Sequence, residues 1–288
     1  MAKQLLGKTV VAQMKEGIVA RVEALRAQGV EPTLAFLRVG NRPDDLSYQR
    51  SATKRAEGRG IATREFVLPE TATDVEVEEA LRVINQDPGI HGCLMFRPLP
   101  GALSDERAAA VLASEKDVDG ITASSLAAVF TDHEQGFPPC TAQACLEMLD
   151  AYQVPLQGRH VVVVGRSLVI GKPVSLMLLR RNATVTMAHS RTQDLAALTR
   201  QADVVVCATG RAKAFGPEYF ASGQTVLDVG INFDEQGNLC GDVDFDQVEP
   251  VVGAITPVPG GIGSVTTECL MDHVVTAAER AAHGEGGR

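Results

Sequence analysis

The sequence predicts an α/β fold built as two domains, each organised around a parallel sheet. Short apolar runs typical of buried strands alternate with segments in which apolar residues recur every three or four positions, as in helices. This alternation stops at Gln135–Thr141, a stretch with two consecutive prolines, and then starts again. A chain of 288 residues is long enough for two modest domains with separate cores. These observations favour parallel strands covered by helices.

The first half of the chain predicts three helices and three strands. Apolar residues from Val11 to Leu25 have helical spacing, and Gly29 is expected to end that helix. Asp44 or Asp45 is expected to cap the next one. The expected helices span residues 9–28, 46–58 and 74–84, and the expected strands span residues 32–40, 62–68 and 92–96.

The second half predicts a Rossmann-like domain, because strands and helices alternate again. Its expected helices span residues 142–152, 172–181 and 195–201, and its expected strands span residues 160–164, 184–187, 204–207 and 225–229. The last helix is expected to return to the first domain. The predicted domains are therefore residues 1–141 with 267–288, and residues 142–266.

Composition and charge argue against several classes of function. The formal net charge is −9 and 4% of the residues are aromatic, which disfavours nucleic-acid and anionic-membrane partners, since both need a cationic face. The six cysteines lack a C-x-x-C pair and the six histidines are dispersed, so no metal site is expected. Free thiols suit a reducing compartment, and neither a signal peptide nor a membrane-spanning run is evident. We therefore expect a cytoplasmic protein.

A glycine motif follows the strand of valines in the second domain. Gly165-Arg166-Ser167 and then Gly171 lie between that strand and a helix, although the pattern departs from G-x-G-x-x-G. A strand, glycine turn and helix in this order present free backbone N–H groups and a positive dipole end to a phosphate. The motif predicts a dinucleotide site; a purely structural turn is the alternative.

The end of the next strand indicates which dinucleotide is bound. A cofactor with a free ribose 2′-OH usually meets Asp or Glu about 20 residues after the glycines. Here the strand ends in His189-Ser190-Arg191, without a carboxylate. A 2′-phosphate could be bound by Arg166, Ser190 and Arg191. The sequence therefore predicts NADP in preference to NAD. His189 has the alternative role of a hydrogen-bonded residue at the rim.

A loop rich in proline and glycine, Thr256–Gly263, precedes the last helix. Its prolines restrict the backbone and its glycines remove side chains, so the loop can approach a flat ligand closely. An ordinary tight turn is the alternative. The loop gains meaning beside the other motifs of the chain, which are Val164–Ser167 with Gly171–Pro173, Lys116–Gly120, Pro139–Thr141, Asp228–Asn232 and Gly241–Phe245.

In the order and spacing of these motifs, the chain resembles the methylenetetrahydrofolate dehydrogenase/cyclohydrolase family of one-carbon metabolism, over essentially its full length. The resemblance implies an N-terminal folate-binding catalytic domain and a Rossmann-like NADP-binding domain with a cleft between them, and a homodimer. It implies that Tyr48 stacks on the folate ring and that Asp119 binds the pterin. The folate pocket would also be lined by Pro259, Gly260 and Gly261, and the cofactor would be bound by Gly165, Arg166, Ser167, Ser190 and Ile231. Gly171 and His189 are expected to bind the cofactor as well, from their places in the glycine motif and at the end of the next strand. The alternatives are that Tyr48 is an aromatic at the core edge and Asp119 a turn or cap residue.

Two positions depart from the family pattern. The family's catalytic lysine follows the tyrosine by four residues, and here that position is Ala52. Lys54 lies roughly 120° away around the helix at about 100° per residue, and the nearby Arg55 is permanently protonated. The family's glutamine position is Phe96, and strand alternation is expected to turn Arg97 to the opposite face.

These replacements predict which of the two family reactions is kept. Hydride transfer depends mainly on holding two bound partners in line, whereas hydrolysis needs proton-transfer groups that activate water. The sequence therefore predicts an NADP-dependent 5,10-methylenetetrahydrofolate dehydrogenase with weak or absent cyclohydrolase activity. The alternatives are a fully bifunctional enzyme and a catalytically silent paralogue that binds NADP or folate.

Overall fold

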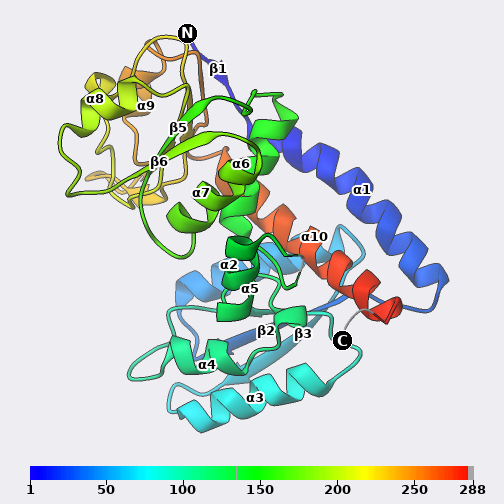
Figure 1. The fold of residues 1–288 in the computed structure, drawn as a ribbon. Helices are drawn as coiled ribbons and strands as arrows, with labels where there is room; N and C mark the ends of the chain where they lie inside the picture. The colour runs from blue at the N-terminus through cyan, green and yellow to red at the C-terminus, as the bar shows by residue number, and fades with distance from the viewer. Residues whose placement is uncertain (134, 285–288) are drawn as a thin grey trace. The chain divides into compact units, whose positions relative to one another are not determined.

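The structure, a computed structural model, describes residues 1–133 and 135–284 and contains two compact units (Figure 1). Unit 1 consists of Met1–Ala12 and Thr141–Thr266. Unit 2 consists of Gln13–Cys140 and the chain from Thr267 onward. Helices α1 (Gly7–Ala27) and α10 (Ile262–Ala282) contribute residues to both units. Each unit is described by itself.

Unit 2 is built on a three-stranded parallel sheet with the strand order β3-β2-β4. Thr33 of β2 pairs with Ala62 of β3, and Leu34 of β2 pairs with Gly92 of β4. The strands are β2 (Thr33–Val39), β3 (Ala62–Leu68) and β4 (Gly92–Met95). The helices are α2 (Pro43–Glu57), α3 (Asp74–Gln86), α4 (Asp105–Val111), α5 (Ala123–Thr131) and a 3-10 turn, η1 (Ser114–Lys116), besides parts of α1 and α10.

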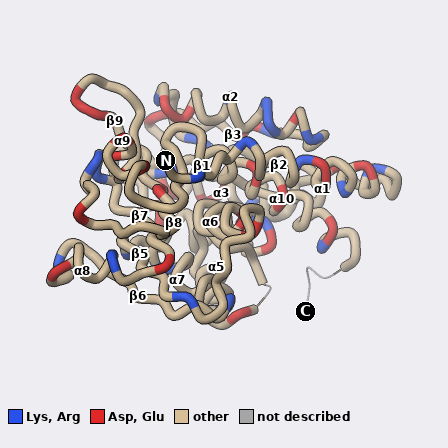
Figure 2. Tube along the Cα trace, turned by 90° about the horizontal axis from the view of Figure 1, so that it is seen from above, with Lys and Arg blue, Asp and Glu red and all other residues tan. Residues whose placement is uncertain are grey.

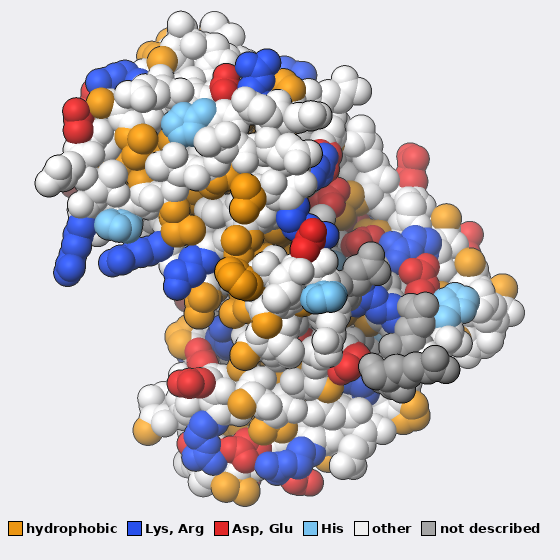
Figure 3. Space-filling view, in the orientation of Figure 1, with side chains coloured by type: hydrophobic (Ala, Val, Ile, Leu, Met, Phe, Trp, Pro, Cys, Tyr) orange, Lys and Arg blue, Asp and Glu red, His pale blue; other side chains and the backbone are white. Residues whose placement is uncertain are grey.

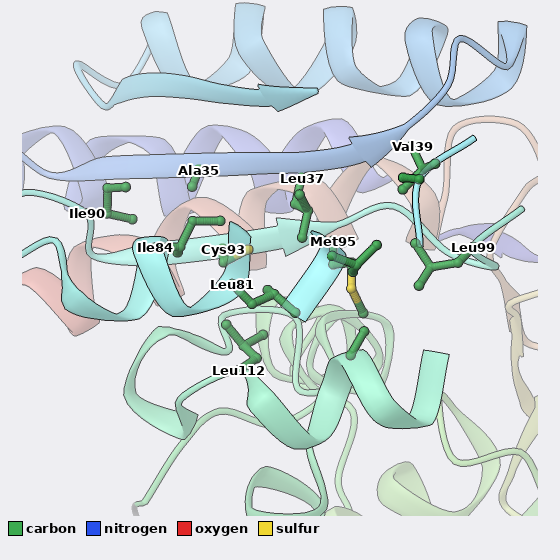
Figure 4. Close-up of a cluster of buried hydrophobic side chains, with 13 residues drawn as sticks. Ala35, Leu37, Val39, Leu81, Ile84, Ile90, Cys93, Met95, Leu99 and Leu112 are labelled. Carbon is green, nitrogen blue, oxygen red and sulfur yellow. The ribbon is translucent and has the colours of Figure 1, made fainter. Parts of the chain in front are cut away.

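One face of this sheet packs against α3 and α4. Leu37 of β2 and Met95 of β4 point toward Leu81 of α3 in a cluster of buried side chains (Figure 4). Because successive side chains of a strand alternate between faces, Phe36 and Leu94 lie on the other face. Phe36 on that second face contacts the ring of Phe96, which in turn contacts Tyr48 of α2.

Helix α2 begins earlier than the sequence predicts. Its first residue is Pro43 and its N-cap is Arg42, whose side chain makes no capping hydrogen bond, so the expected caps Asp44 and Asp45 lie inside the first turn instead. Proline is favoured at the first helical position because its missing N–H has no intrahelical partner there. Acidic residues of the first turn and basic residues of the last turn match the helix dipole (Figure 2).

Unit 1 is built on a six-stranded parallel sheet with the order β1-β11-β8-β7-β5-β6. Its strands are β1 (Lys3–Gln4), β5 (His160–Val164), β6 (Thr184–Ala188), β7 (Val204–Cys207), β8 (Thr225–Asp228) and β11 (Ala254–Ile255), with a separate antiparallel pair of β9 (Asn232–Phe233) and β10 (Leu239–Cys240). Its helices are α6 (Cys140–Ala151), α7 (Gly171–Arg180), α8 (Leu195–Arg200), α9 (Phe245–Val248) and the 3-10 turn η2 (Pro217–Tyr219). The strand order reverses at β5, which has β6 on one side and β7 on the other, and ligands of open α/β sheets bind at such a reversal.

The α/β class and the two parallel sheets predicted from the sequence are confirmed. The structural units differ from the predicted domains at the N-terminus, because Lys3 and Gln4 pair with Ala254 and Ile255 and so draw residues 1–12 into unit 1. Helices α4 and α5 and the short strands were not predicted. None of the helices in the described part of the chain combines the length and hydropathy that crossing a bilayer requires.

Candidate functional site

The predicted folate residues of unit 2 are Tyr48 on α2 and Asp119 in the loop after η1, and Phe96, at the expected glutamine position, follows β4. The loop is held by its neighbours. Lys116 Nζ donates to the backbone carbonyls of Ile84 and Asp87 at the end of α3, at 2.7 and 2.6 Å. Lys116 therefore has a structural role.

The two aspartates of this loop have different roles. Asp117 is fully buried, and its carboxylate accepts backbone N–H groups of Ile121 and Thr122 at 2.9 and 2.8 Å. The side chain of Asp119 is 29% exposed and is the one that a ligand can reach. Asp117 thus shapes the turn so that Asp119 faces outward.

Tyr48 lies beside Asp119 and Phe96. Its ring meets that of Phe96 edge to face, with the centroids 6.1 Å apart and the planes at 77°. Burial of the hydroxyl raises the pKa of Tyr48 above its ordinary value, and the charge of Asp119 adds to that shift, while a hydrogen bond with Thr267 opposes it. The tyrosine stays protonated at neutral pH, and 38% of its surface is open for ring stacking.

The pKa of Asp119 is raised to about 6, first of all by burial and also by the charge of Asp117. Arg97 and a hydrogen bond with Cys140 oppose the rise. Nη2 of Arg97 lies 3.9 Å from Oδ2 of Asp119. This guanidinium is a site residue that the sequence missed: β4 ends at Met95, so strand alternation does not extend to Arg97 as expected.

Ala52 and Phe96, the two residues expected to depart from the family pattern, are both buried. Ala52 of α2 is fully buried, and Phe96 is 6% exposed, with its ring 6.1 Å from that of Phe36 as well as from that of Tyr48. Lys54 lies on the exposed side of α2, as its helical angle predicts. Arg55 is paired with Glu268 of α10 at 2.8 Å. Lys54 is thus exposed and Arg55 is engaged in an ion pair.

Cys140, at the start of α6, was not singled out by the sequence as a site residue. Its thiol contacts the carbonyl of Val118 at 3.1 Å and Nδ1 of His273 at 3.6 Å. Burial and the charge of Asp119 raise the pKa of Cys140 well above its ordinary value. The thiol is therefore a neutral neighbour of Asp119 and not a nucleophile.

In unit 1, Gly165 directly follows β5 at the point where the strand order reverses. Its φ is +143°, and a Cβ atom there would lie 2.3 Å from the carbonyl oxygen of Ala208 after β7. A Cβ at Gly171 would lie 2.3 Å from the carbonyl oxygen of Gly165. Both glycines are thus required by close backbone packing, which brings the start of α7 against the end of β5.

The turn between these glycines has features that suit a phosphate. Arg166 and Ser167 are exposed, and Ser167 Oγ accepts the backbone N–H of Ile170 at 3.1 Å. Helix α7 has ten residues, and its N-cap makes no side-chain hydrogen bond. Helix N-termini of this kind bind anions through backbone N–H groups and the helix dipole.

The end of β6 has no carboxylate, in accord with its sequence. Ser190 and Arg191 are exposed, and His189 Nδ1 accepts the backbone N–H of Arg191 at 3.1 Å. His189 therefore holds the loop, which is its alternative role. The side chain of Arg191 is exposed. Basic side chains gather beside a histidine on one edge of this unit (Figure 3).

Two buried carboxylates that the sequence did not assign hold the loops around Ile231. Asp228 accepts the backbone N–H groups of Gly230, Asp242 and Val243 at 2.9 to 3.0 Å. Asp242 accepts N–H groups of Thr209, Gly210 and Arg211 and the side-chain amide of Asn232. Ile231 is 68% exposed on this scaffold, where an apolar ligand surface can meet it.

The loop of Pro259, Gly260 and Gly261 belongs to unit 1. Gly260 has a φ of +103°, and its carbonyl accepts the N–H of Gly7 at 2.8 Å. A Cβ at Gly261 would lie 2.5 Å from the carbonyl oxygen of Pro257, so that residue is needed for packing. Pro259 and Gly260 are exposed and can contact a ligand.

No cluster of metal-ligating side chains occurs among residues 1–133 and 135–284.

Unit 2 has a groove of about 1170 Å³, lined by residues that include Thr33, His91 and Lys116. Thr33 and His91 lie at the amino ends of β2 and β4, whereas Phe96 and Arg97 follow the carboxyl end of β4. The groove is separate from the predicted site residues.

Comparison with known sequences gives matches over both halves of the chain. The family models described as tetrahydrofolate dehydrogenase/cyclohydrolase, catalytic domain, and tetrahydrofolate dehydrogenase/cyclohydrolase, NAD(P)-binding domain, match residues 5–119 and 139–282. The bifunctional protein FolD of Carboxydothermus hydrogenoformans is 48% identical over 281 residues, which cover 97% of this chain and 98% of that protein. FolD of Clostridioides difficile is 46% identical over 273 residues and covers 95% of each chain.

Solved structures give the same result. The bifunctional FolD of Campylobacter jejuni superposes with a TM-score of 0.94 at 35% identity, covering 97% of this chain and 99% of that one. The methylenetetrahydrofolate dehydrogenase-cyclohydrolase of Trypanosoma brucei, solved with NADP and an inhibitor, superposes with a TM-score of 0.91 at 31% identity, covering 98% of each chain.

Proposed function

The chain belongs to the tetrahydrofolate dehydrogenase/cyclohydrolase family, and from this premise we propose that it is an NADP-dependent 5,10-methylenetetrahydrofolate dehydrogenase with weak or absent cyclohydrolase activity. The observation that carries the second part is the apolar pair of Ala52 and Phe96 at the positions of the family's lysine and glutamine. The product of the oxidation is 5,10-methenyltetrahydrofolate.

In this proposal unit 1 binds NADP, which accepts the hydride. Gly165, Ser167 and Gly171 allow the pyrophosphate to approach the N-terminus of α7, and Arg166, Ser190 and Arg191 receive the 2′-phosphate. The close backbone packing at both glycines and the exposure of the basic side chains support this fit. Ile231 offers an exposed apolar surface to the cofactor, while His189 supports the loop.

Unit 2 binds the folate ring. The exposed part of Tyr48 stacks on the ring, and the carboxylate of Asp119 accepts its N–H donors. Pro259, Gly260 and Gly261 contribute the remaining contacts. No group of the protein has to move a proton in the hydride step, because the nitrogen lone pairs of the folate stabilise the cation that forms. Orientation of the two reactants is worth about 7–11 kcal/mol in such reactions.

Hydrolysis of the methenyl product makes a different demand. Water must be activated and protons must be moved, which is the work of a general acid and base worth roughly 10²–10⁴-fold. The buried methyl group of Ala52 and the ring of Phe96 can do neither. Lys54 is on the exposed side of α2 and Lys116 is bound to two carbonyls, so neither lysine compensates.

A second candidate is the fully bifunctional enzyme. The observation that favours it is Asp119, a partly exposed carboxylate whose pKa of about 6 suits a general base. The relatives named above as bifunctional FolD proteins are in line with this candidate. The decay of methenyltetrahydrofolate absorbance with and without the protein decides between the two: a rate close to the spontaneous one supports the monofunctional enzyme, and a rate well above it supports the bifunctional one.

A third candidate is a catalytically silent paralogue that binds NADP or folate. Production of NADPH that depends on methylenetetrahydrofolate separates both enzymes from this candidate, and parallel assays with NAD test the cofactor preference. We further propose that the protein is a cytoplasmic homodimer. Its six cysteines are free and buried, which suits a reducing compartment.

A further inference from the structure

Arg97 is an arginine that the rest of the protein leaves incompletely bonded. Its Nε atom is buried without a hydrogen-bond partner, and no other side-chain nitrogen or oxygen in the described part of the chain is in that state. A buried donor without an acceptor is unfavourable for folding, and an apolar residue of similar size would avoid it. Residues that lower stability in this way are typical of functional sites.

The guanidinium lies beside the carboxylate that faces outward from unit 2. Arg97 Nη2 is 3.9 Å from Asp119 Oδ2, a separation that fits an ion pair but exceeds a hydrogen bond. The two side chains are exposed to nearly the same extent, 28% and 29%, so both reach the same surface. The pair joins the segment after β4 to the loop after η1.

Arg97 is the cation that acts on Asp119. The other groups that influence this carboxylate or respond to it are Asp117 of the same loop, Cys140 of α6, Cys93 of β4 and Tyr48 of α2. The aspartate is negative, and the two thiols and the phenol are neutral because burial raises the pKa of each. Among these groups the guanidinium is the one positive charge, and it favours the ionised form of Asp119 together with the hydrogen bond from the thiol of Cys140.

We propose that Arg97 is a positioning residue that keeps Asp119 ionised and turned toward the N–H donors of the folate ring. The inference rests on the proposed function, in which Asp119 binds folate. Arg97 then sets the affinity for folate without touching the atoms between which hydride is transferred, so its loss affects KM and not kcat.

The substitution Arg97→Leu tests this role. Calorimetry measures the Kd of tetrahydrofolate between pH 5.5 and 8.5 under anaerobic conditions. If loss of the cation raises the pKa of Asp119 by about one unit, binding at pH 6 weakens about fivefold, because the ionised fraction falls from roughly a half to roughly a tenth. Binding at pH 8.5 stays within about twofold of the unsubstituted protein, since the carboxylate is ionised in both.

Three further variants make the test specific. Arg97→Lys keeps the positive charge and is expected to keep the original pH profile. Arg64→Leu removes an exposed arginine of β3 that is paired with Asp87, and it serves as a matched control without effect on the profile. In an Asp119→Asn background, Arg97→Leu is expected to add no further pH dependence, because the partner through which it acts is gone.

The outcomes separate this inference from the proposed function. If the unsubstituted protein binds tetrahydrofolate and Arg97→Leu has the same pH profile, the positioning role is overturned while the proposed function stands. If the unsubstituted protein does not bind tetrahydrofolate at all, both fail. Thermal unfolding supplies an independent readout: Arg97→Leu is expected to leave Tm equal or higher, and a lower Tm with an unchanged profile would make the residue structural.

Discussion

Phe96 meets Tyr48 edge to face, with the ring centroids 6.1 Å apart. The contact joins the segment after β4 to helix α2 and places an aromatic ring where the family pattern has a polar glutamine. Ala52, four residues after Tyr48 on α2, is also buried. The first prediction tests whether these two residues determine the rate of the hydrolytic reaction.

The double substitution Ala52→Lys with Phe96→Gln is expected to raise methenyltetrahydrofolate hydrolysis by at least about 10²-fold, since an amine and an amide again become available for proton transfer. Decay of methenyl absorbance is the measurement. Lys54→Ala is the matched control and should change nothing, because Lys54 lies on the exposed side of α2. Fast hydrolysis by the unsubstituted protein would contradict the premise.

The affinity for folate is expected to fall on the acid side. The pKa of Asp119 is raised to about 6, so the carboxylate is ionised above that pH and becomes protonated as the pH falls through it. A protonated carboxyl loses acceptor capacity, and KM for methylenetetrahydrofolate therefore rises below about pH 6. Initial rates of NADPH formation between pH 5 and 8 measure this rise of KM at acid pH.

Asp119→Asn provides the control for the rise of KM at acid pH. The amide does not titrate, so KM is expected to be high at every pH and to lose its acid rise, while kcat changes much less. An acid limb that persists in Asp119→Asn would assign it to another group, such as the substrate itself.

Helix α2 is joined to α10 by buried charges. Glu268 is fully buried and accepts N–H groups from Arg55 and Arg59 at 2.7 to 2.8 Å. Glu268→Gln leaves two guanidiniums without their counter-charge and is expected to destabilise the protein by about 3 kcal/mol, measured by urea unfolding. Glu79→Gln, which removes an exposed pair with Arg82, should cost less than about 1 kcal/mol. Equal effects of the two variants would show that burial of the pair is unimportant.

Cofactor preference is expected to depend on the loop after β6. Arg191→Ala should raise KM for NADP about tenfold, because a charge-assisted contact with the 2′-phosphate is lost, and should leave KM for NAD unchanged. Arg159→Ala, at the amino end of β5 where it pairs with Asp203, is the control. If Arg191→Ala raised KM for NADP and KM for NAD equally, Arg191 would have a role other than selecting the 2′-phosphate.

Much of the fold could be predicted because its signals are local. The valines of β5, the three- and four-residue spacing in α3 and the glycines around α7 each fix an element from neighbouring positions. Helices α4 and α5 were missed because they are short and their apolar spacing is weak. The N-cap of α2 was misplaced because Asp44 and Asp45 suit a first turn as well as a cap.

The candidate site divides in the same way. The α/β class, the positions of the glycine turns and the identities of Ala52 and Phe96 could be read from the chain alone. Three features became visible only in the folded chain: Asp117 holds the turn by accepting backbone N–H groups, Asp119 faces outward, and Arg97 lies beside Asp119. The reason is physical: helical and strand periodicity act between near neighbours in the chain, whereas charge and burial act through space on residues that the fold brings together from distant segments.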